Sequence, residues 1–152
     1  MSTQFGSRLV ESAKAMHRLG LEIGVRCAPG LRIGLVGAFG AGKTTLVRGI
    51  AEGMGVTVPI ASPTYAIVED HGMLIHVDWC RIEDEVELDA IDFDAYMDSD
   101  GVVVVEWADR FPRRLGDDAL ILRITAPTAE TRRVVAEGSA HMVDDFAVVF
   151  PR

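Results

Sequence analysis

Apolar and polar residues alternate along the chain in a way that predicts helices and strands in succession. Residues 1–20 are polar overall and predict an amphipathic helix. Four apolar side chains there recur at helical spacing: Leu9, Ala13, Met16 and Leu19. The apolar run LRIGLV at 31–36 predicts a buried strand, and TTLVRGIAEGMG at 44–55 predicts a helix directly after it.

Two pairs of short strands predict antiparallel hairpins. The first pair covers residues 65–69 and 73–78, around a turn at His71-Gly72. The second pair covers 119–125 and 131–138, around the turn APTAE. The first hairpin interrupts the chain where a simple parallel sheet would continue, so we expect a mixed sheet.

Three further segments complete the pattern. Four valines at 102–105 predict a central parallel strand that ends at Glu106. Leu88, Ile91 and Ala95 stand at helical spacing and predict an acidic amphipathic helix over the sheet. The last segment, 141–152, gives no clear prediction.

Length and composition indicate a single domain over residues 1–152. The chain is 49% hydrophobic and 25% charged, and at this size a chain buries roughly 70% of its unfolded surface. No uninterrupted apolar stretch approaches the roughly 18 residues of a membrane span. Cys27 and Cys80 form no C-x-x-C pair, and no export signal precedes them, so we expect a reduced, cytoplasmic protein without membrane partners.

The excess negative charge is concentrated in one segment. The net charge is -8, and residues 69–100 hold twelve acidic side chains against one base, Arg81. Nucleic-acid affinity comes largely from Lys and Arg, so direct RNA or DNA binding is disfavoured there. Two interpretations remain open, a solvated helix face and a docking face for a basic protein.

The stretch GAFGAGKTT at 37–45 carries the clearest chemistry. Residues 37–44 satisfy G-x-x-x-x-G-K-[ST], between a predicted strand and a predicted helix. Such a loop points successive backbone N–H groups inward, and the helix dipole adds to their attraction for phosphates. Lys43 reaches the β- and γ-phosphates, and the Thr44 hydroxyl is a ligand for Mg²⁺. The motif therefore predicts a nucleoside triphosphate site.

Glu106 is the candidate for the acidic partner that a P-loop requires. It ends the valine strand, where a carboxylate holds magnesium or its waters. Trp107, next to it, either stacks on the nucleotide or seals the core. Guanine-specific proteins usually carry N-K-x-D, and the chain has no asparagine, so a small GTPase is improbable. The D-x-x-G match at 98–101 precedes a strand and is interpreted as a turn.

The segment 62–81 adds further candidates. Pro63 keeps its neighbours extended, so Thr64 lies on a loop, as either a switch contact or a turn residue. Asp78 ends a predicted strand beside Arg81, where it could orient water or form a salt bridge. A zinc site is conceivable in this segment, but its spacing fits no metal pattern and favours an ordinary polar cluster. The side chains concerned are His71, His76, Asp78 and Cys80.

In order, these motifs resemble the TsaE family, also called YjeE. The matching features are GAFGAGKTT, SPTY, the H-x-D motif of His76 and Asp78 with an arginine three residues on, and a valine strand ending in Glu-Trp. That family is the small bacterial ATPase needed to make threonylcarbamoyladenosine in tRNA. The resemblance implies a P-loop NTPase-like α/β domain of three layers, with antiparallel hairpins inserted in a mixed sheet.

The resemblance also implies roles for individual residues, with ATP and Mg²⁺ as cofactors. Thr44 and Glu106 would bind Mg²⁺, and Lys43, Asp78 and Glu106 would serve hydrolysis. Phosphate and nucleotide contacts would come from Gly40, Ala41, Gly42, Lys43, Thr44, Thr45, Thr64 and Trp107.

The implied partners are TsaD and TsaB, with tRNA reached only through their complex. The alternative function is a small-molecule P-loop kinase. Such kinases usually cover the phosphates with an arginine-rich lid, whereas only Arg48 and Arg81 lie between the P-loop and the valine strand.

Overall fold

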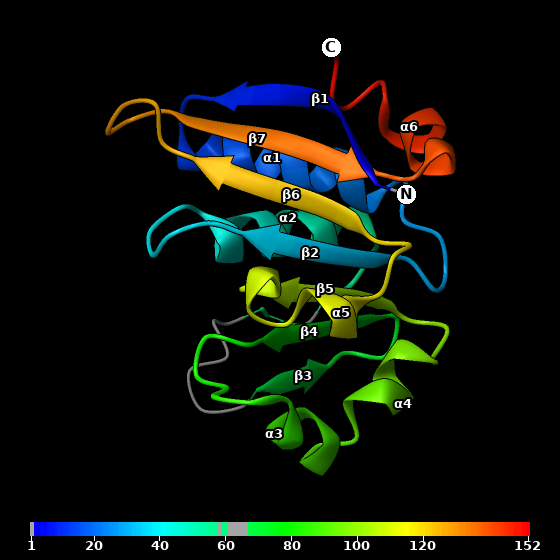
Figure 1. The fold of residues 1–152 in the computed structure, drawn as a ribbon. Coiled ribbons are helices and arrows are strands. Elements are labelled where there is room, and N and C mark those ends of the chain that lie inside the picture. The colour runs from blue at the N-terminus through cyan, green and yellow to red at the C-terminus, as the bar shows by residue number, and fades with distance from the viewer. Residues whose placement is uncertain (1, 58, 61–66) are drawn as a thin grey trace.

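The computed structural model describes residues 2–57, 59–60 and 67–152 (Figure 1). Its strands are β1 Thr3–Val10, β2 Arg32–Val36, β3 Val68–Asp70, β4 Leu74–Asp78, β5 Val102–Glu106, β6 Leu120–Thr125 and β7 Arg132–Gly138. Its helices are α1 Ala13–Gly24, α2 Lys43–Gly53, α3 Glu85–Ala90, α4 Phe93–Met97, the 3₁₀ helix η1 Ala108–Arg110, α5 Pro112–Leu115 and α6 Ala140–Phe146.

Within the described residues the strands form one seven-stranded sheet in the order β1-β7-β6-β2-β5-β4-β3. Strands β6, β2, β5 and β4 run parallel to one another, while β1, β7 and β3 pair antiparallel with their neighbours. The predicted β6–β7 hairpin is therefore present, and the first predicted hairpin is present as β3–β4. Residues 65–66 of its predicted first strand lie outside the described residues. All five residues of the valine strand β5 are buried, as a central parallel strand requires.

Helices cover both faces of the sheet, as the predicted α/β fold with three layers requires (Figure 1). Helices α1 and α2 lie on one face, over a core that includes Leu35, Leu46 and Val104. A second core on the other face includes Val103, Val105 and Trp79, together with side chains of α3, α4, η1 and α5. The side chains of β5 alternate between these cores, because successive residues of a strand face opposite sides.

The prediction of a helix over residues 1–20 is wrong for its first half. Residues 3–10 form β1, which pairs with β7, and Leu9 is 48% exposed there. Apolar spacing favoured a helix, but hydrogen bonding along β7 satisfies the backbone of this segment as a strand. Helix α1 begins only after Ser12, whose side-chain oxygen accepts a hydrogen bond from Ala15 N.

The predicted acidic helix is divided into two short helices. Asp92 adopts a left-handed backbone conformation with φ of 55°, which ends α3 before α4 begins. Leu88 is buried as expected, but Phe93 and Met97 rather than Ala95 supply the buried side chains of the second helix. Residues 98–101 lie in the turn before β5, as interpreted from the sequence.

Helices α1 and α2 touch through their backbones along what we call the glycine seam, formed by Gly20, Gly24, Gly49 and Gly53. A Cβ atom added at Gly20 would lie 2.4 Å from the carbonyl oxygen of Leu46. One added at Gly49 would lie 2.2 Å from the carbonyl oxygen of His17. Only glycine allows this approach, which fixes α1 directly against the helix that follows the P-loop.

Among the helices in the described parts of the chain, none is long and apolar enough to cross a membrane.

Candidate functional site

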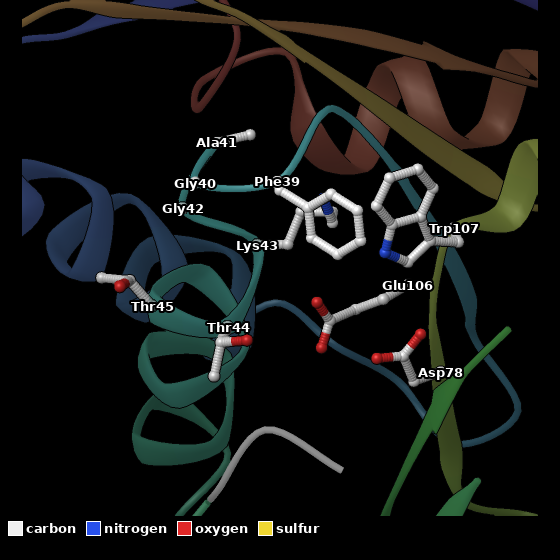
Figure 2. Close-up of a pocket in the computed structure, with 10 residues that line it drawn as sticks. All are labelled: Phe39, Gly40, Ala41, Gly42, Lys43, Thr44, Thr45, Asp78, Glu106 and Trp107. Carbon is white, nitrogen blue, oxygen red and sulfur yellow. The ribbon is translucent and has the colours of Figure 1, made fainter. Parts of the chain in front are cut away.

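The P-loop lies between the end of β2 and the start of α2, at the edge of the sheet where β4 and β5 also end (Figure 2). Parallel strands carry their carboxyl ends to one edge, so Val36, Asp78 and Glu106 end side by side. Gly40 and Gly42 have φ of 76° and 103°, which glycine adopts without strain. The loop therefore curls around the N-terminus of α2.

Lys43 is the most constrained residue of the loop. Its Nζ donates hydrogen bonds to the carbonyl oxygens of Gly37 at 2.6 Å and Ala38 at 2.8 Å. The same atom lies 4.4 Å from the ring centroid of Trp107, and the residue is only 6% exposed. Burial lowers the pKa of Lys43, while the charges of Glu106 and Asp78 act in the opposite direction. The P-loop thus holds the ammonium group of Lys43 at the cavity.

Asp78 and Glu106 are directly opposite each other in the β4–β5 ladder. Both side chains therefore leave the sheet on the face that carries α2, and Figure 2 shows both carboxylates projecting toward the start of that helix. Burial raises the pKa of Asp78, and the charge of Glu106 adds to the effect. The hydrogen bond that Asp78 Oδ1 accepts from Cys80 N, at 2.8 Å, lowers that pKa in part. A cation bound next to Asp78 and Glu106 would offset the repulsion between their two negative charges.

Glu106 also makes a buried contact beneath the cavity. Its Oε2 lies 2.5 Å from Nε2 of His76, and the two side chains are 4% and 0% exposed. His71 instead contacts Glu69 Oε2 at 3.2 Å. Among the described residues, no group of three or more His, Cys, Asp or Glu side chains could hold a metal ion by themselves. His76 belongs to the carboxylate site rather than to a cluster with His71.

These groups enclose a cavity of about 380 Å³. It is lined by Phe39, Gly40, Ala41, Gly42, Lys43, Thr44, Thr45, Asp78, Glu106 and Trp107. The structure thus brings together every site residue predicted from the sequence except Thr64, which lies outside the described residues and stays a prediction. Trp107 faces the cavity and also packs partly against the second core. Its contact with the nucleotide stays a prediction.

Phe39 was not identified from the sequence. It is 79% exposed, and its ring centroid lies 4.8 Å from that of Trp107. It occupies a variable position of the P-loop motif, so no sequence signal marked it. An aromatic pair consequently forms the rim of the cavity above Lys43 (Figure 2).

The oxygen atoms at this site fit Mg²⁺ by their chemistry. Thr44 offers a hydroxyl and Glu106 a carboxylate, both hard oxygen donors of the kind Mg²⁺ takes together with water and substrate phosphates. Two protein donors would leave room around the metal for water and phosphate oxygens.

A second cavity of about 220 Å³ lies across the P-loop and was missed by sequence reasoning. It shares Gly40, Ala41, Gly42 and Thr45 with the first cavity, and its remaining lining residues are Val10, Ser12, Ala13, Met16, Glu130 and Arg132. Arg132 Nη2 donates to Gly40 O at 3.3 Å. These residues come from β1, the start of α1 with its N-cap, the β6–β7 turn and the start of β7, so no local motif could have grouped them.

A family model described as threonylcarbamoyl adenosine biosynthesis protein TsaE matches residues 10–134. The tRNA threonylcarbamoyladenosine biosynthesis protein TsaE of Streptomyces coelicolor is 40% identical over 121 residues, covering 72% of this chain and 81% of the relative. The Bacillus subtilis protein of the same name is 36% identical over 128 residues, covering 82% of this chain and 78% of the relative.

The fold has a counterpart among solved structures. The crystal structure of YdiB from Bacillus subtilis superposes with a TM-score of 0.76 at 24% sequence identity. The match covers 95% of this chain and 91% of that chain, so it extends beyond the P-loop to the whole sheet.

Proposed function

The chain belongs to the TsaE family of threonylcarbamoyl adenosine biosynthesis proteins, and from that premise we propose that it is an Mg²⁺-dependent ATPase. One observation carries the proposal: a P-loop lysine and two strand-end carboxylates line the same cavity at the start of a helix. The family accounts for a role in tRNA modification, and the chemistry of the cavity supports the nucleotide.

The P-loop would bind the phosphates. The inward N–H groups of residues 40–45 and the start of α2 attract negative charge. Lys43 would exchange the carbonyl oxygens of Gly37 and Ala38 for β- and γ-phosphate oxygens, which offer a full negative charge. Thr44 and Glu106 would hold Mg²⁺, which would neutralise negative charge on the phosphates.

Asp78 would position the attacking water. Water adds to the γ-phosphorus as the bond to the β-phosphate oxygen breaks, ADP leaves, and the proton of the water passes to the Asp78 carboxylate. A carboxylate with a raised pKa accepts a proton more readily than an ordinary one. Burial of Asp78 therefore supports this role over that of a surface ion pair.

The second cavity would bind the nucleoside. With Asp78 and Glu106 serving hydrolysis, the γ-phosphate would lie toward them, and the opposite end of the nucleotide would lie across the P-loop, beyond Thr45. There Val10 and Met16 offer apolar contact for a base, and Glu130 and Arg132 offer polar groups at the rim.

We assign the protein TsaD and TsaB as partners, with tRNA reached only through their complex. Part of the acidic segment has a structural task, because Asp84 and Glu87 form a capping box and Arg114 pairs with Asp89 and Asp94. Other acids of the segment are exposed, among them Glu83, Glu85 and Asp98. Such a surface suits a basic protein better than a phosphate backbone.

The experiment that tests this function is ATP hydrolysis by the purified protein with Mg²⁺, alone and with TsaB and TsaD. Stimulation by the two proteins together is the expected result. Absence of stimulation, combined with ADP release that depends on an added metabolite, would instead establish a small-molecule kinase.

A further inference from the structure

His76 is a histidine buried completely in the sheet, in contact with the carboxylate proposed to bind magnesium. It sits in the middle of β4, and its Nε2 lies 2.5 Å from Oε2 of Glu106 at the end of β5. The side chains are 0% and 4% exposed. Neither hydrolysis nor phosphate binding, as described above, uses this contact.

The contact is a consequence of strand register. His76 pairs with Val104 in the parallel β4–β5 ladder, and Glu106 stands two residues further along β5. Residues two apart project from the same face of a strand, so His76 and Glu106 are diagonal neighbours within reach of long side chains. The histidine thus reaches the carboxylate from the core side, opposite the cavity.

The donor in this hydrogen bond follows from the proposed role of Glu106. A carboxylate that binds Mg²⁺ is ionised and only accepts hydrogen bonds, so Nε2 of His76 would carry the hydrogen. In the neutral ring Nδ1 is then an acceptor, and within the described residues that buried atom has no hydrogen-bond partner. An apolar side chain would avoid this unfavourable burial, so packing alone gives no reason for histidine here.

We propose that His76 is a positioning residue for the magnesium-binding carboxylate. By engaging Oε2 it fixes the rotamer of Glu106 and leaves Oε1 to bind a cation in the cavity that Thr44 also lines. Hydrogen-bond partners of metal ligands commonly raise metal affinity by orienting the ligand. This inference rests on the proposed function, since it takes Glu106 as a ligand of Mg²⁺.

Metal affinity rather than activity tests the proposal. Mn²⁺ would be titrated, as a spectroscopic substitute for Mg²⁺, into wild type, His76→Leu and His76→Gln in the presence of a non-hydrolysable ATP analogue. His76→Leu should weaken Mn²⁺ binding about 10- to 100-fold. Nucleotide affinity in EDTA should stay unchanged. His76→Gln should restore part of the loss, because its amide N–H can replace Nε2. The exposed His141→Gln is the matched control and should behave as wild type.

A double-mutant cycle separates positioning from a general structural role. In a Glu106→Ala background, His76→Gln should cause no further loss of Mn²⁺ affinity, because the residue it orients is gone. An equal loss in both backgrounds, or a loss of nucleotide affinity in EDTA, would overturn the proposal.

Nitrogen NMR of the wild-type ring provides a test that does not depend on the folding of variants. The Nε2–H tautomer is expected, and the Nδ1–H tautomer would overturn the proposal. Glu106→Ala distinguishes failure of the proposed function from failure of the positioning role of His76. If Glu106→Ala leaves Mn²⁺ affinity unchanged, the proposed function and the positioning role of His76 are both overturned. Affinity that responds to Glu106→Ala but not to His76→Leu would overturn this role alone.

Discussion

Lys43 lies beneath the indole of Trp107, with Nζ 4.4 Å from the ring centroid and two P-loop carbonyl oxygens as its hydrogen-bond acceptors. The P-loop cation is therefore held by its own loop and by an aromatic face before any phosphate arrives. Binding of a triphosphate has to displace those carbonyl contacts, and Trp107 is placed to report the change.

Lys43→Ala should abolish ATP binding, because the charge that reaches the β- and γ-phosphates is lost. In wild type, ATP should change the emission of Trp107. The other tryptophan, Trp79, is fully buried, so Trp107→Phe should remove the response while leaving the remaining emission intact. Lys14→Ala, on the exposed face of α1, is the control and should bind ATP as wild type. Retained ATP binding by Lys43→Ala would contradict the assignment.

Asp78→Asn should lower hydrolysis by about 10²- to 10⁴-fold, since an amide cannot accept the proton of water. ATP affinity should change little, because Asn removes no phosphate contact. Single-turnover kinetics alongside binding titrations would measure both. Equal hydrolysis by variant and wild type would exclude Asp78 from the reaction.

The same variant should be more stable than wild type at neutral pH. The pKa of Asp78 is raised in the folded state, so the native protein binds more protons than the unfolded chain between the two pKa values. Stability therefore falls as pH rises through this window, and the unfavourable effect is complete above the folded-state pKa. The difference in Tm between Asp78→Asn and wild type should shrink as pH falls toward about 3.9. A difference independent of pH would contradict the argument.

Ala13→Phe should fill the second cavity from its exposed rim and weaken ATP binding. Affinity for inorganic triphosphate should be unaffected, because the P-loop contacts remain. Lys14→Phe adds the same ring one residue along, outside the cavity lining, and serves as the control. If Ala13→Phe lowers the affinity for ATP and for inorganic triphosphate equally, the second cavity does not bind the nucleoside.

Gly49→Ala should destabilise the protein by about 1–3 kcal/mol, as overpacking of a filled site does. In an ordinary helix the same change stabilises by roughly 0.5–1 kcal/mol, so the sign itself is diagnostic. The added Cβ would meet the backbone oxygen of His17, which cannot rotate away. Denaturant unfolding measures the difference, with Lys14→Ala on the exposed face of α1 as control.

Reversal of charge on the acidic segment should weaken binding to the TsaB–TsaD complex. Glu83, Glu85 and Asp98 are suitable, because no capping or salt-bridge contact in the described structure involves their side chains. Their replacement by Lys should lower affinity for the TsaB–TsaD complex. Added salt should lower the affinity of the wild-type protein for the same complex. The exposed pair Asp144 and Asp145 on α6 is the control. Binding insensitive to salt would count against an acidic docking face.

The P-loop and its acidic partners could be predicted because each is a local pattern. The residues from Gly40 to Thr45 form one contiguous loop, and Asp78 and Glu106 each end an apolar strand. Parallel pairing then brings the strand ends together without further information. The β6–β7 hairpin was predictable for the same reason, since its turn and both strands are adjacent in sequence.

Features that depend on distant segments could not be predicted. Residues 3–10 become a strand because β7, more than a hundred residues later, supplies its hydrogen-bond partners. The contact of His76 with Glu106 depends on register between two strands, which a single sequence does not display. The second cavity likewise joins three segments that only the fold brings together.

The glycine seam decides which parts of the protein can transmit the state of the nucleotide. Helix α1 contributes the rim of the second cavity, and α2 carries the phosphate-binding lysine. Backbone contact between them leaves no side-chain layer to slide or repack, so both ends of an ATP molecule bound as proposed would rest on one rigid block. A signal that distinguishes ATP from ADP would then travel through elements on the other side of the ligand, namely the ends of β4 and β5 and the Phe39–Trp107 pair.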